Sequence, residues 1–389
     1  MLIQRRALSE LLKLLESEHI VLVEGPPRCG LSTLAAQLAR AEGPRALLAE
    51  AASPLGRALL AEPGQALREL GRGARPTPRL LLVDGAGAAE EASLRASLAA
   101  GGAEGACRFV LFGRAFPADS PLPRLALGPL SLAEVGPAAR TSHWLRGGFP
   151  EAFGAPSEAA AAAWLARYAD SISEERFAAA GLPWAPGRSR ALLSMIAEAQ
   201  GGPLNENGAA RSLGLSRPTV ARAAAALERA GLVRFLPSLR SPEGRRLPRA
   251  PAVYLRDSGL YHALLGILGM EALLGSARLA ASWEGYVLGQ LLAALPPGVA
   301  AARRAGRSGT ALELVLSRPG LAPAAVSVRW ARGGGPGRAA AEAAREIGAA
   351  QAWLVLPEAE GREREDGFVE LGVAAAIERV ERWALGDFE

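Results

Sequence analysis

The stretch VEGPPRCGLSTL, residues 23–34, has the residue types and the spacing of a phosphate-binding loop. Gly25, Gly30 and Ser32 fit the pattern G-x-x-x-x-G-K-[ST], in which backbone N–H groups converge on phosphate oxygens at the N-terminus of a helix. The lysine that bridges the β- and γ-phosphates in this pattern is replaced by Leu31. The candidate nucleotide-binding residues are Gly25, Pro26, Pro27, Arg28, Cys29, Gly30, Leu31, Ser32 and Thr33.

Magnesium is the expected companion of a bound nucleotide, and Ser32 and Asp84 are its candidate ligands. Asp84 ends the apolar run RLLLVDG, residues 79–85, as a magnesium-associated aspartate should. The next position, where many ATPases keep a water-activating glutamate, is Gly85. ATP and Mg²⁺ are therefore the expected cofactors, although Leu31 and Gly85 both count against them.

Two other loop residues admit more than one interpretation. Arg28 lies inside the loop and could supply the missing positive charge from a different backbone position. Cys29 is interpreted as a small buried loop residue, with a reactive thiol as the alternative. On spacing alone, the segment could also be an ordinary strand–turn–helix with only a packing role.

The first 135 or so residues alternate strand and helix signals, and these elements would position the loop. All-apolar strands that alternate with helices indicate an α/β fold, with a parallel sheet covered by helices on both faces. The predicted strands are residues 20–24, 46–51, 79–85 and 107–113, and the predicted helices are residues 32–43, 55–70 and 90–101.

From about residue 140 to 200 the pattern becomes helical, and it then predicts a helix–turn–helix. A short helix and a turn at Gly214 precede a second helix, which Ser216 caps and which has Pro218 in its first turn. An apolar strand, a turn at Pro242–Gly244 and a returning strand complete the outline of a winged helix.

Basic residues gather on this winged helix, where guanidinium groups could bind DNA phosphates and enter the major groove. The alternative is a packing or protein-contact module, because arginine is common throughout the chain. The candidate DNA contacts are Arg217, Thr219 and Arg222 on the second helix, and Arg240, Arg245, Arg246 and Arg249 around the wing.

The last part of the chain, residues 272–389, predicts a second and smaller α/β unit. Its predicted helices are residues 282–295 and 338–348, and its predicted strands are residues 311–316, 324–330, 352–356 and 368–371. No internal repeat is present.

The chain has 389 residues, with 44 Lys and Arg against 39 Asp and Glu, and a net charge of +5. This balance permits an anionic partner such as DNA. Lys13 is the only lysine. A coding bias toward Ala, Arg and Gly explains this better than selection at each site, and such a bias also erodes functional lysines.

Cysteine usage and hydropathy indicate a cytoplasmic protein without a membrane span. Cys29 and Cys107 form neither a disulfide framework nor a zinc pattern, which favours a reducing compartment. The N-terminal residues lack the features of a signal peptide, and no run of about 18 apolar residues occurs. His19, His143 and His262 lie far apart without metal-ligand spacing.

The sequence resembles the bacterial and archaeal family of AAA-type ATP-binding proteins that pair a P-loop ATPase with a C-terminal domain of unknown function. The resemblance covers nearly the whole chain, and WLRGGFPE followed by YLRDSGL is quite specific to that family. Other segments that carry it are GPPRCGLSTLAAQLA, LLLVDG, LPRLALGPLSLAEV, LGLSRPTVARAAAALERAGLVRFLP and WEGYVLGQLL. It implies a P-loop core over residues 1–138, a helical region over 139–196, a winged helix over 197–268 and a restriction-endonuclease-like domain over 269–389.

The resemblance also assigns possible roles to residues outside the loop. LFGR matches the segment that senses the γ-phosphate, with Phe112 in place of its threonine and Arg114 in place of its serine. SEERF matches a helix end that keeps Glu175 and Arg176. The candidate catalytic residues are Asp84, Arg114 and Arg176.

In the nuclease-like domain, the resemblance places a metal site on a helix and two strands. Glu284 matches the helix carboxylate, and Glu313 stands where an aspartate is usual. Ser327 replaces a glutamate and Arg329 replaces the lysine that assists the water. Because two hard ligands remain and arginine keeps its proton, we expect no nuclease activity.

These substitutions together predict an ATP-binding protein with degenerate Walker motifs, which binds nucleotide weakly with little or no hydrolysis. Such a protein would act as a switch or a scaffold, with DNA as a further candidate partner. The alternative is a nucleotide-independent DNA-binding or protein-interaction module built on a pseudo-ATPase. No particular protein partner follows from the sequence.

Overall fold

The structure is a computed structural model of the chain. It describes residues 3–71, 78–99, 107–114, 116–117, 119–179, 182, 187–239, 250–306, 309–330 and 336–387. Contacts divide the chain into two compact units, Met1–Leu130 and Ser131–Glu389. The division into four domains that the sequence suggests remains a prediction.

The first unit is built on a five-stranded parallel sheet with the strand order β2-β3-β4-β1-β5, an order of the P-loop type. The middle strands are covered on both faces, so their sequences are continuous apolar runs without alternation. The strands are β1 (Ile20–Glu24), β2 (Ala46–Glu50), β3 (Leu80–Ala86), β4 (Arg108–Gly113) and β5 (Arg124–Ala126). The predicted α/β fold class is confirmed.

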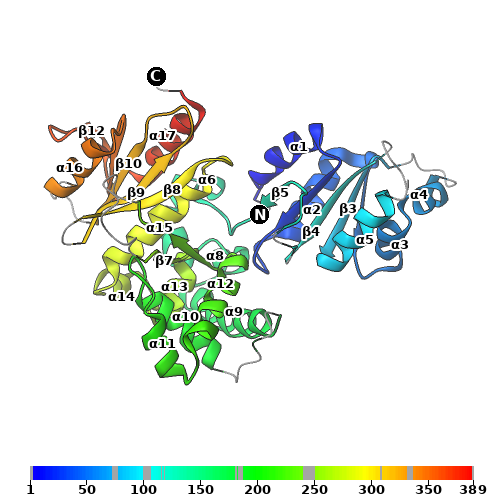
Figure 1. Cartoon of the computed structure of the whole chain (residues 1–389), viewed down its shortest axis with the longest axis horizontal. Coiled ribbons are helices and arrows are strands. Elements are labelled where there is room, and N and C mark those ends of the chain that lie inside the picture. The colour runs from blue at the N-terminus through cyan, green and yellow to red at the C-terminus, as the bar shows by residue number, and fades with distance from the viewer. Residues whose placement is uncertain are drawn as a thin grey trace. The chain divides into compact units, whose positions relative to one another are not determined.

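Helices cover both faces of this sheet (Figure 1). The helices α1 (Ala7–Ser17) and α2 (Leu31–Glu42) pack on one face, and α3 (Pro54–Ala61) and α5 (Ala88–Ala99) pack on the other. The single helix predicted over residues 55–70 is wrong. A separate helix, α4 (Pro63–Gly71), begins at Pro63, because proline has no N–H to continue the hydrogen bonds of α3.

The second unit begins with helices. A helix–turn–helix follows, made of α11 (Glu206–Leu213), a left-handed turn at Gly214 and α12 (Arg217–Arg229). The predicted cap is confirmed, because the Ser216 hydroxyl accepts a hydrogen bond from the N–H of Thr219. The other helices of this region are α6 (Leu132–Val135), α7 (Arg140–Arg146), α8 (Pro150–Phe153), α9 (Glu158–Ala179), α10 (Arg188–Glu198), α13 (Ser258–Leu264) and α14 (Met270–Leu274).

An antiparallel hairpin of β6 (Val233–Leu236) and β7 (Ala252–Leu255) follows the helix–turn–helix. The predicted turn at Pro242–Gly244 lies outside the described residues. Among the described residues, no helix is both long enough and apolar enough to cross a membrane.

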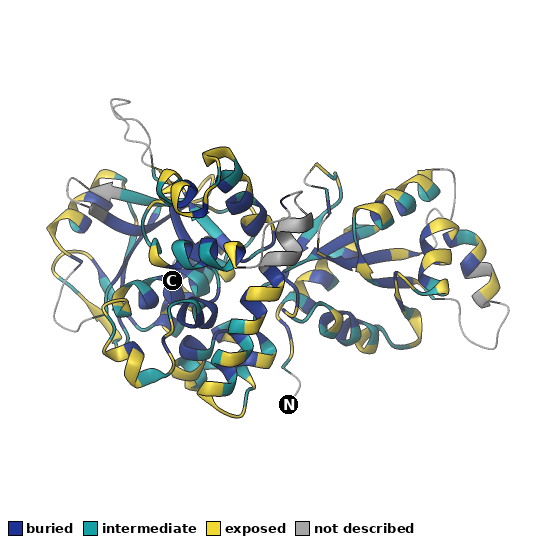
Figure 2. Cartoon of the chain, turned by 90° about the horizontal axis from the view of Figure 1, so that it is seen from below, coloured by how far each residue is buried: buried dark blue, intermediate teal, exposed yellow. Residues whose placement is uncertain are grey.

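The rest of the second unit is a six-stranded mixed sheet with the order β12-β13-β11-β10-β9-β8. Large apolar side chains of α15 (Leu279–Ala293) and α17 (Val373–Leu385) pack on one face, and small ones of α16 (Arg338–Glu346) pack on the other. The strands are β8 (Ala300–Gly306), β9 (Gly309–Ser317), β10 (Ala324–Val328), β11 (Gln351–Val355), β12 (Glu360–Glu363) and β13 (Val369–Leu371). In each unit the buried residues concentrate in the sheet and on the helix faces against it (Figure 2).

Candidate functional sites

The candidate phosphate loop joins the carboxyl end of β1 to the N-terminus of α2. A Cβ atom on Gly25 would lie 2.2 Å from the carbonyl oxygen of Leu127, so only glycine fits there. Gly30 has a φ of 105° and precedes α2. Arg28 has a φ of 65°, and it is the only non-glycine residue with a positive φ in the described part of the chain. Such a conformation costs on the order of 1 kcal/mol, and strain of this kind concentrates at functional sites.

The backbone of residues 30–33 offers N–H groups to a ligand. Within the described chain these groups donate to no protein acceptor, and no side chain caps α2. The positive end of the helix dipole adds to the potential at the same place. The loop therefore presents donors of the kind that hold a phosphate.

The side chains of the loop differ in exposure and in charge. The buried ones are Pro26, Pro27 and Cys29, the half-buried ones are Leu31 and Thr33, and the exposed ones are Arg28 and Ser32. The interpretation of Cys29 as a buried loop residue is confirmed. Leu31 places an uncharged side chain where the phosphate-bridging lysine would stand.

Asp84 lies at the carboxyl end of β3, in register with Phe112 of β4. Leu81 and Val83 pack with α3 and α5, so strand alternation places Asp84 on the face of α2. Ser32 lies in the first turn of α2, and the two residues therefore share one edge and one face of the sheet. A hydroxyl and a carboxylate are hard oxygen ligands that suit Mg²⁺, which completes its shell with water and phosphate.

The groups that usually promote hydrolysis are missing around Asp84. Gly85 has no side chain, and its N–H donates to Asp84 Oδ1 at 2.9 Å. Phe112 is fully buried, and its benzyl group has no hydrogen-bond donor for a γ-phosphate. Of the acidic pair that the resemblance implies at this strand, the chain has Asp84 alone, and its catalytic role stays a prediction.

Two arginines were expected to reach the phosphates. Arg114 lies directly after β4 and is exposed. Arg176 lies in α9, and its side chain, like that of Glu175, is outside the described residues. Their role stays a prediction.

Sequence reasoning missed Arg5, a buried arginine beside the loop. Its guanidinium donates from Nη1 to the carbonyl of Cys29 at 2.6 Å and from Nη2 to that of Gly128 at 2.7 Å. In a chain with 44 basic residues, nothing in the sequence distinguishes this one.

The helix–turn–helix presents part of the predicted DNA-contact set. Arg217 and Arg222 are exposed on α12. Arg217 Nε donates to the Glu206 carboxylate at 2.8 Å, and the Thr219 hydroxyl bonds that of Ser216 at 2.8 Å. The wing residues Arg240, Arg245, Arg246 and Arg249 lie outside the described residues.

The residues matched to a nuclease site lie together in a buried polar cluster of the second unit. Glu313 of β9 accepts hydrogen bonds at Oε2 from the Ser327 hydroxyl and from the Val328 N–H, both at 3.0 Å. Its Oε1 accepts from Arg329 Nη1 at 2.8 Å. A guanidinium therefore faces this carboxylate at the position where the resemblance predicted a metal site.

Glu284 of α15 completes the cluster. Its Oε1 accepts a hydrogen bond of 2.7 Å from the Tyr254 hydroxyl, a β7 residue that sequence reasoning did not identify. Burial, together with repulsion from Glu313, raises the pKa of Glu284 to about 7. Because Glu313 already accepts three hydrogen bonds, one of them from Arg329, and Glu284 is about half protonated at pH 7, the cluster does not fit a divalent metal. Among the described residues, no group of three or more His, Cys, Asp and Glu could hold a metal ion.

Asp257 joins the two segments that carry the family resemblance, WLRGGFPE and YLRDSGL. Its Oδ2 accepts from the N–H of Gly148 at 2.7 Å, and its Oδ1 accepts from the N–H of Leu260 at 2.8 Å. Burial raises the pKa of Asp257 to about 6, although these N–H groups oppose the shift. The arrangement ties the first turn of α13 to the turn after α7.

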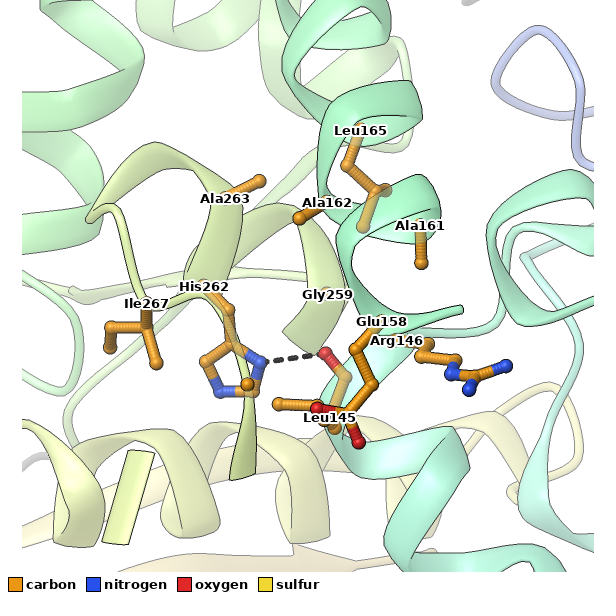
Figure 3. Close-up of a pocket in the computed structure, with 11 residues that line it drawn as sticks. Leu145, Arg146, Glu158, Ala161, Ala162, Leu165, Gly259, His262, Ala263 and Ile267 are labelled. Carbon is orange, nitrogen blue, oxygen red and sulfur yellow. Dashed lines mark hydrogen bonds between the residues drawn. The ribbon is translucent and has the colours of Figure 1, made fainter. Parts of the chain in front are cut away.

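His262 lies in the same buried region and is part of a hydrogen-bond chain. Its Nδ1 faces the carbonyl of Leu145 at 2.9 Å (Figure 3). Its Nε2 faces the hydroxyl of Ser282 at 2.6 Å. A carbonyl only accepts, so Nδ1 carries the proton and Nε2 accepts from Ser282, which in turn accepts from Trp144 Nε1 at 2.9 Å. Burial lowers the pKa of His262 to about 4, so the ring is neutral.

A cavity beside His262 is lined by residues of α7, α9 and α13 (Figure 3). Its volume is about 10 Å³, which is roughly the space of one water molecule. The cavity is therefore too small for a ligand larger than a water molecule.

The chain is similar to one family profile, to curated proteins of two mycobacteria and to several solved structures. A family profile described as a domain of unknown function (DUF8612) matches residues 139–271. The chain is 33% identical over 307 residues to the uncharacterized protein Rv2008c of Mycobacterium tuberculosis, an alignment that covers 76% of this chain and 68% of that protein. The uncharacterized protein Mb2031c of Mycobacterium bovis matches with the same values.

Among solved structures, the Walker-type ATPase PABY2304 of Pyrococcus abyssi matches with a TM-score of 0.43 and 13% identity. That match covers 68% of this chain and 96% of the other. The RuvB Holliday junction branch migration motor of Thermotoga maritima matches with a TM-score of 0.28 and 17% identity, over 62% of this chain and 91% of the other. Because both TM-scores lie below 0.5, the fold class rests on the strand order of the first unit.

Proposed function

The chain belongs to the family of the uncharacterized mycobacterial protein Rv2008c, and we propose that it is a nucleotide-binding protein with little or no ATPase activity. In this proposal the loop of residues 25–33 holds the phosphates of ATP, with Mg²⁺ at Ser32 and Asp84. Bound Mg²⁺ would neutralise phosphate charge. The protein would act as a switch or a scaffold whose state depends on nucleotide occupancy.

The shape of the loop carries this proposal. The N–H groups of residues 30–33 lie at the N-terminus of α2, and they donate to no acceptor in the described part of the chain. Arg28 is held in a strained left-handed conformation in the same loop. Because every helix leaves its first N–H groups without an intrahelical partner, these donors support a phosphate site together with the strained backbone of Arg28.

The expected lack of hydrolysis follows from three substitutions. Leu31 removes the charge that stabilises the β- and γ-phosphates in the transition state, and Gly85 removes the group that activates water. Phe112 removes a polar contact to the γ-phosphate. Each loss lowers the rate by itself, and the retained Asp84 cannot replace them.

Restoring the lysine tests the site directly. We expect Leu31→Lys to bind Mg·ATP about tenfold more tightly than the unmodified chain, because an ammonium adds a charge-assisted hydrogen bond to the phosphates. Isothermal titration with Mg·ATP and with a non-hydrolysable analogue measures the change. The matched control is Leu48→Lys, which adds the same charge on the exposed side of β2.

Two results would contradict the proposal. If Leu31→Lys and Leu48→Lys both bound Mg·ATP with the affinity of the unmodified chain, residues 25–33 would be excluded as the phosphate site. Steady hydrolysis of radiolabelled ATP by the unmodified chain, lost in Asp84→Ala, would show an active ATPase.

The second candidate function is DNA binding by the helix–turn–helix, and it does not need nucleotide. The geometry of α11, the turn at Gly214 and α12 supports it, with Arg217 and Arg222 on an exposed face. The ion pair of Arg217 with Glu206 reduces the charge available to phosphates. Thr219 would contribute a hydroxyl, while Arg245 and Arg246 would act from the wing.

A further inference from the structure

Arg5 is almost completely buried, with 4% of its surface exposed, and it lies against the phosphate loop. Its guanidinium bridges two backbone carbonyls that are distant in the sequence, those of Cys29 and Gly128. A longer contact of 3.5 Å reaches the carbonyl of Pro129. Such carbonyl acceptors compensate a buried guanidinium for the loss of water. Here one acceptor belongs to the loop, and the others belong to residues 128 and 129 at the end of the first unit.

The main chain around Arg5 is fixed as well. Gln37 of α2 accepts a hydrogen bond at Oε1 from the N–H of Arg5 at 3.2 Å, and its Nε2 donates to the carbonyl of Ile3 at 2.8 Å. Gln37 is itself buried. The helix that begins at the loop therefore holds the segment that carries Arg5.

The hydrogen bond to Cys29 determines how the loop presents its donors. In a planar trans peptide the C=O and the following N–H point in opposite directions. Because the Cys29 carbonyl points to Arg5, the N–H of Gly30 points away from Arg5. A Cβ atom on Gly30 would lie 3.0 Å from Arg5 Nη1, so the guanidinium closes that side of the loop.

The second carbonyl connects the loop to the segment that leaves the first unit. Leu127 donates its N–H to the carbonyl of Glu24 at 2.7 Å, and its own carbonyl lies against Gly25. Gly128 then accepts from Arg5. Residues 127–129 are thus in contact with both ends of the loop, directly or through Arg5.

We propose that Arg5 is the positioning residue of the phosphate loop, holding the Cys29–Gly30 peptide with its N–H turned to the phosphate side and linking the loop to residues 127–129. This inference rests on the proposed nucleotide-binding function. It identifies a fixed positive charge behind a loop that has no lysine. Through Arg5, a movement of the loop on phosphate binding would be transmitted to residues 127–129.

The test uses the full chain with Arg5→Lys and Arg5→Met. Lysine keeps the charge but has no planar fork to bridge two carbonyls, so both variants should lose the positioning. We expect each to bind Mg·ATP about tenfold more weakly by isothermal titration. Without nucleotide, we expect amide hydrogen exchange to rise about tenfold in peptides covering residues 25–34 and 124–130, while that of α5 stays unchanged.

The matched control is Arg40→Met, which removes an exposed arginine from the last turn of α2. It should leave both the affinity and the exchange rates as in the unmodified chain. Unchanged exchange of residues 25–34 in both Arg5 variants would overturn the positioning role, as would full recovery of affinity and exchange by Arg5→Lys. If the unmodified chain binds no nucleotide while exchange still rises, the proposed function fails and the positioning of the loop by Arg5 stands.

Discussion

Glu284 is a single residue whose protonation the fold controls. It lies buried beside Glu313, and burial raises the pKa of its carboxyl from 4.5 to about 7. A carboxyl with a higher pKa in the folded chain binds its proton more tightly there than in the unfolded chain. Its contribution to stability is therefore fully present below pH 4.5 and is lost as the pH rises through 7.

Replacing Glu284 with glutamine should remove this dependence. The amide oxygen can still accept the hydrogen bond from Tyr254, and the amide does not ionise beside Glu313. We expect the free energy of unfolding of Glu284→Gln, relative to that of the unmodified chain, to rise by about 3 kcal/mol between pH 4.5 and 8. Urea unfolding at a series of pH values measures it.

The control for this series is Glu363→Gln, an exposed glutamate on β12. Its stability should follow that of the unmodified chain at every pH. If the stability of Glu284→Gln also followed that of the unmodified chain at every pH, folding would not raise the pKa of Glu284.

At the scale of elements, α13 depends on one carboxylate for its position. Asp257 accepts from the N–H of Leu260 at the start of α13 and from that of Gly148 beyond α7. Gly259 approaches so closely that an added Cβ atom would lie 2.2 Å from the carbonyl of Arg146. The sequence YLRDSGL is thus explained by packing: the aspartate supplies the acceptors, and the glycine permits the approach.

Asp257→Asn should weaken the second unit. The asparagine amide nitrogen cannot accept, so one buried N–H loses its partner at nearly unchanged side-chain volume. We expect the free energy of unfolding to fall by about 1–3 kcal/mol at pH 4, measured by urea unfolding. The fall should be smaller at pH 7.5, where the substitution also removes a buried charge. Asp387→Asn, at an exposed position near the C-terminus, should change it little. Equal stability of the two variants would mean that Asp257 does not hold α7 and α13 together.

At the scale of the whole molecule, a net charge of +5 permits an anionic partner, and the second unit presents a helix–turn–helix. If DNA binds there, its affinity should fall as salt rises from 50 to 200 mM, since phosphate contacts release counterions. The double variant Arg217→Ala, Arg222→Ala should reduce the logarithmic salt slope by about two. Fluorescence anisotropy with a labelled duplex measures both.

The matched control removes the same charge elsewhere in the second unit, with Arg338→Ala and Arg345→Ala on the exposed side of α16. It should keep the salt slope of the unmodified chain. Equal slopes for the two double variants would exclude α12 as the contact surface, and an affinity independent of salt would exclude phosphate contacts altogether.

The fold of both units followed largely from local patterns in the sequence. The strands β1 to β4 lie within one or two residues of their predictions, because a strand buried on both faces must be apolar throughout. The turn at Gly214 and the cap at Ser216 were predictable because their chemistry involves neighbours within a few residues. The glycine spacing predicted a loop between β1 and α2 for the same reason, and its phosphate-binding role stays a prediction.

Elements and contacts that depend on distant partners were not predictable. The strand β5 has three residues and β12 is fully exposed, so neither has a hydrophobic signal, and hydrogen bonds to a neighbouring strand define both. Arg5 meets Cys29 across 24 residues and Gly128 across 123, and Tyr254 meets Glu284 across 30.

The sequence by itself determined that this protein has a P-loop-type α/β unit, a helix–turn–helix and a second sheet, and that the loop lacks its lysine. Only the tertiary structure decided that a buried guanidinium contacts that loop at Cys29, and that Glu313 of the second unit pairs with Arg329. The physical reason is that the burial and charge of these groups depend on side chains brought together by folding, which no local pattern of residues records.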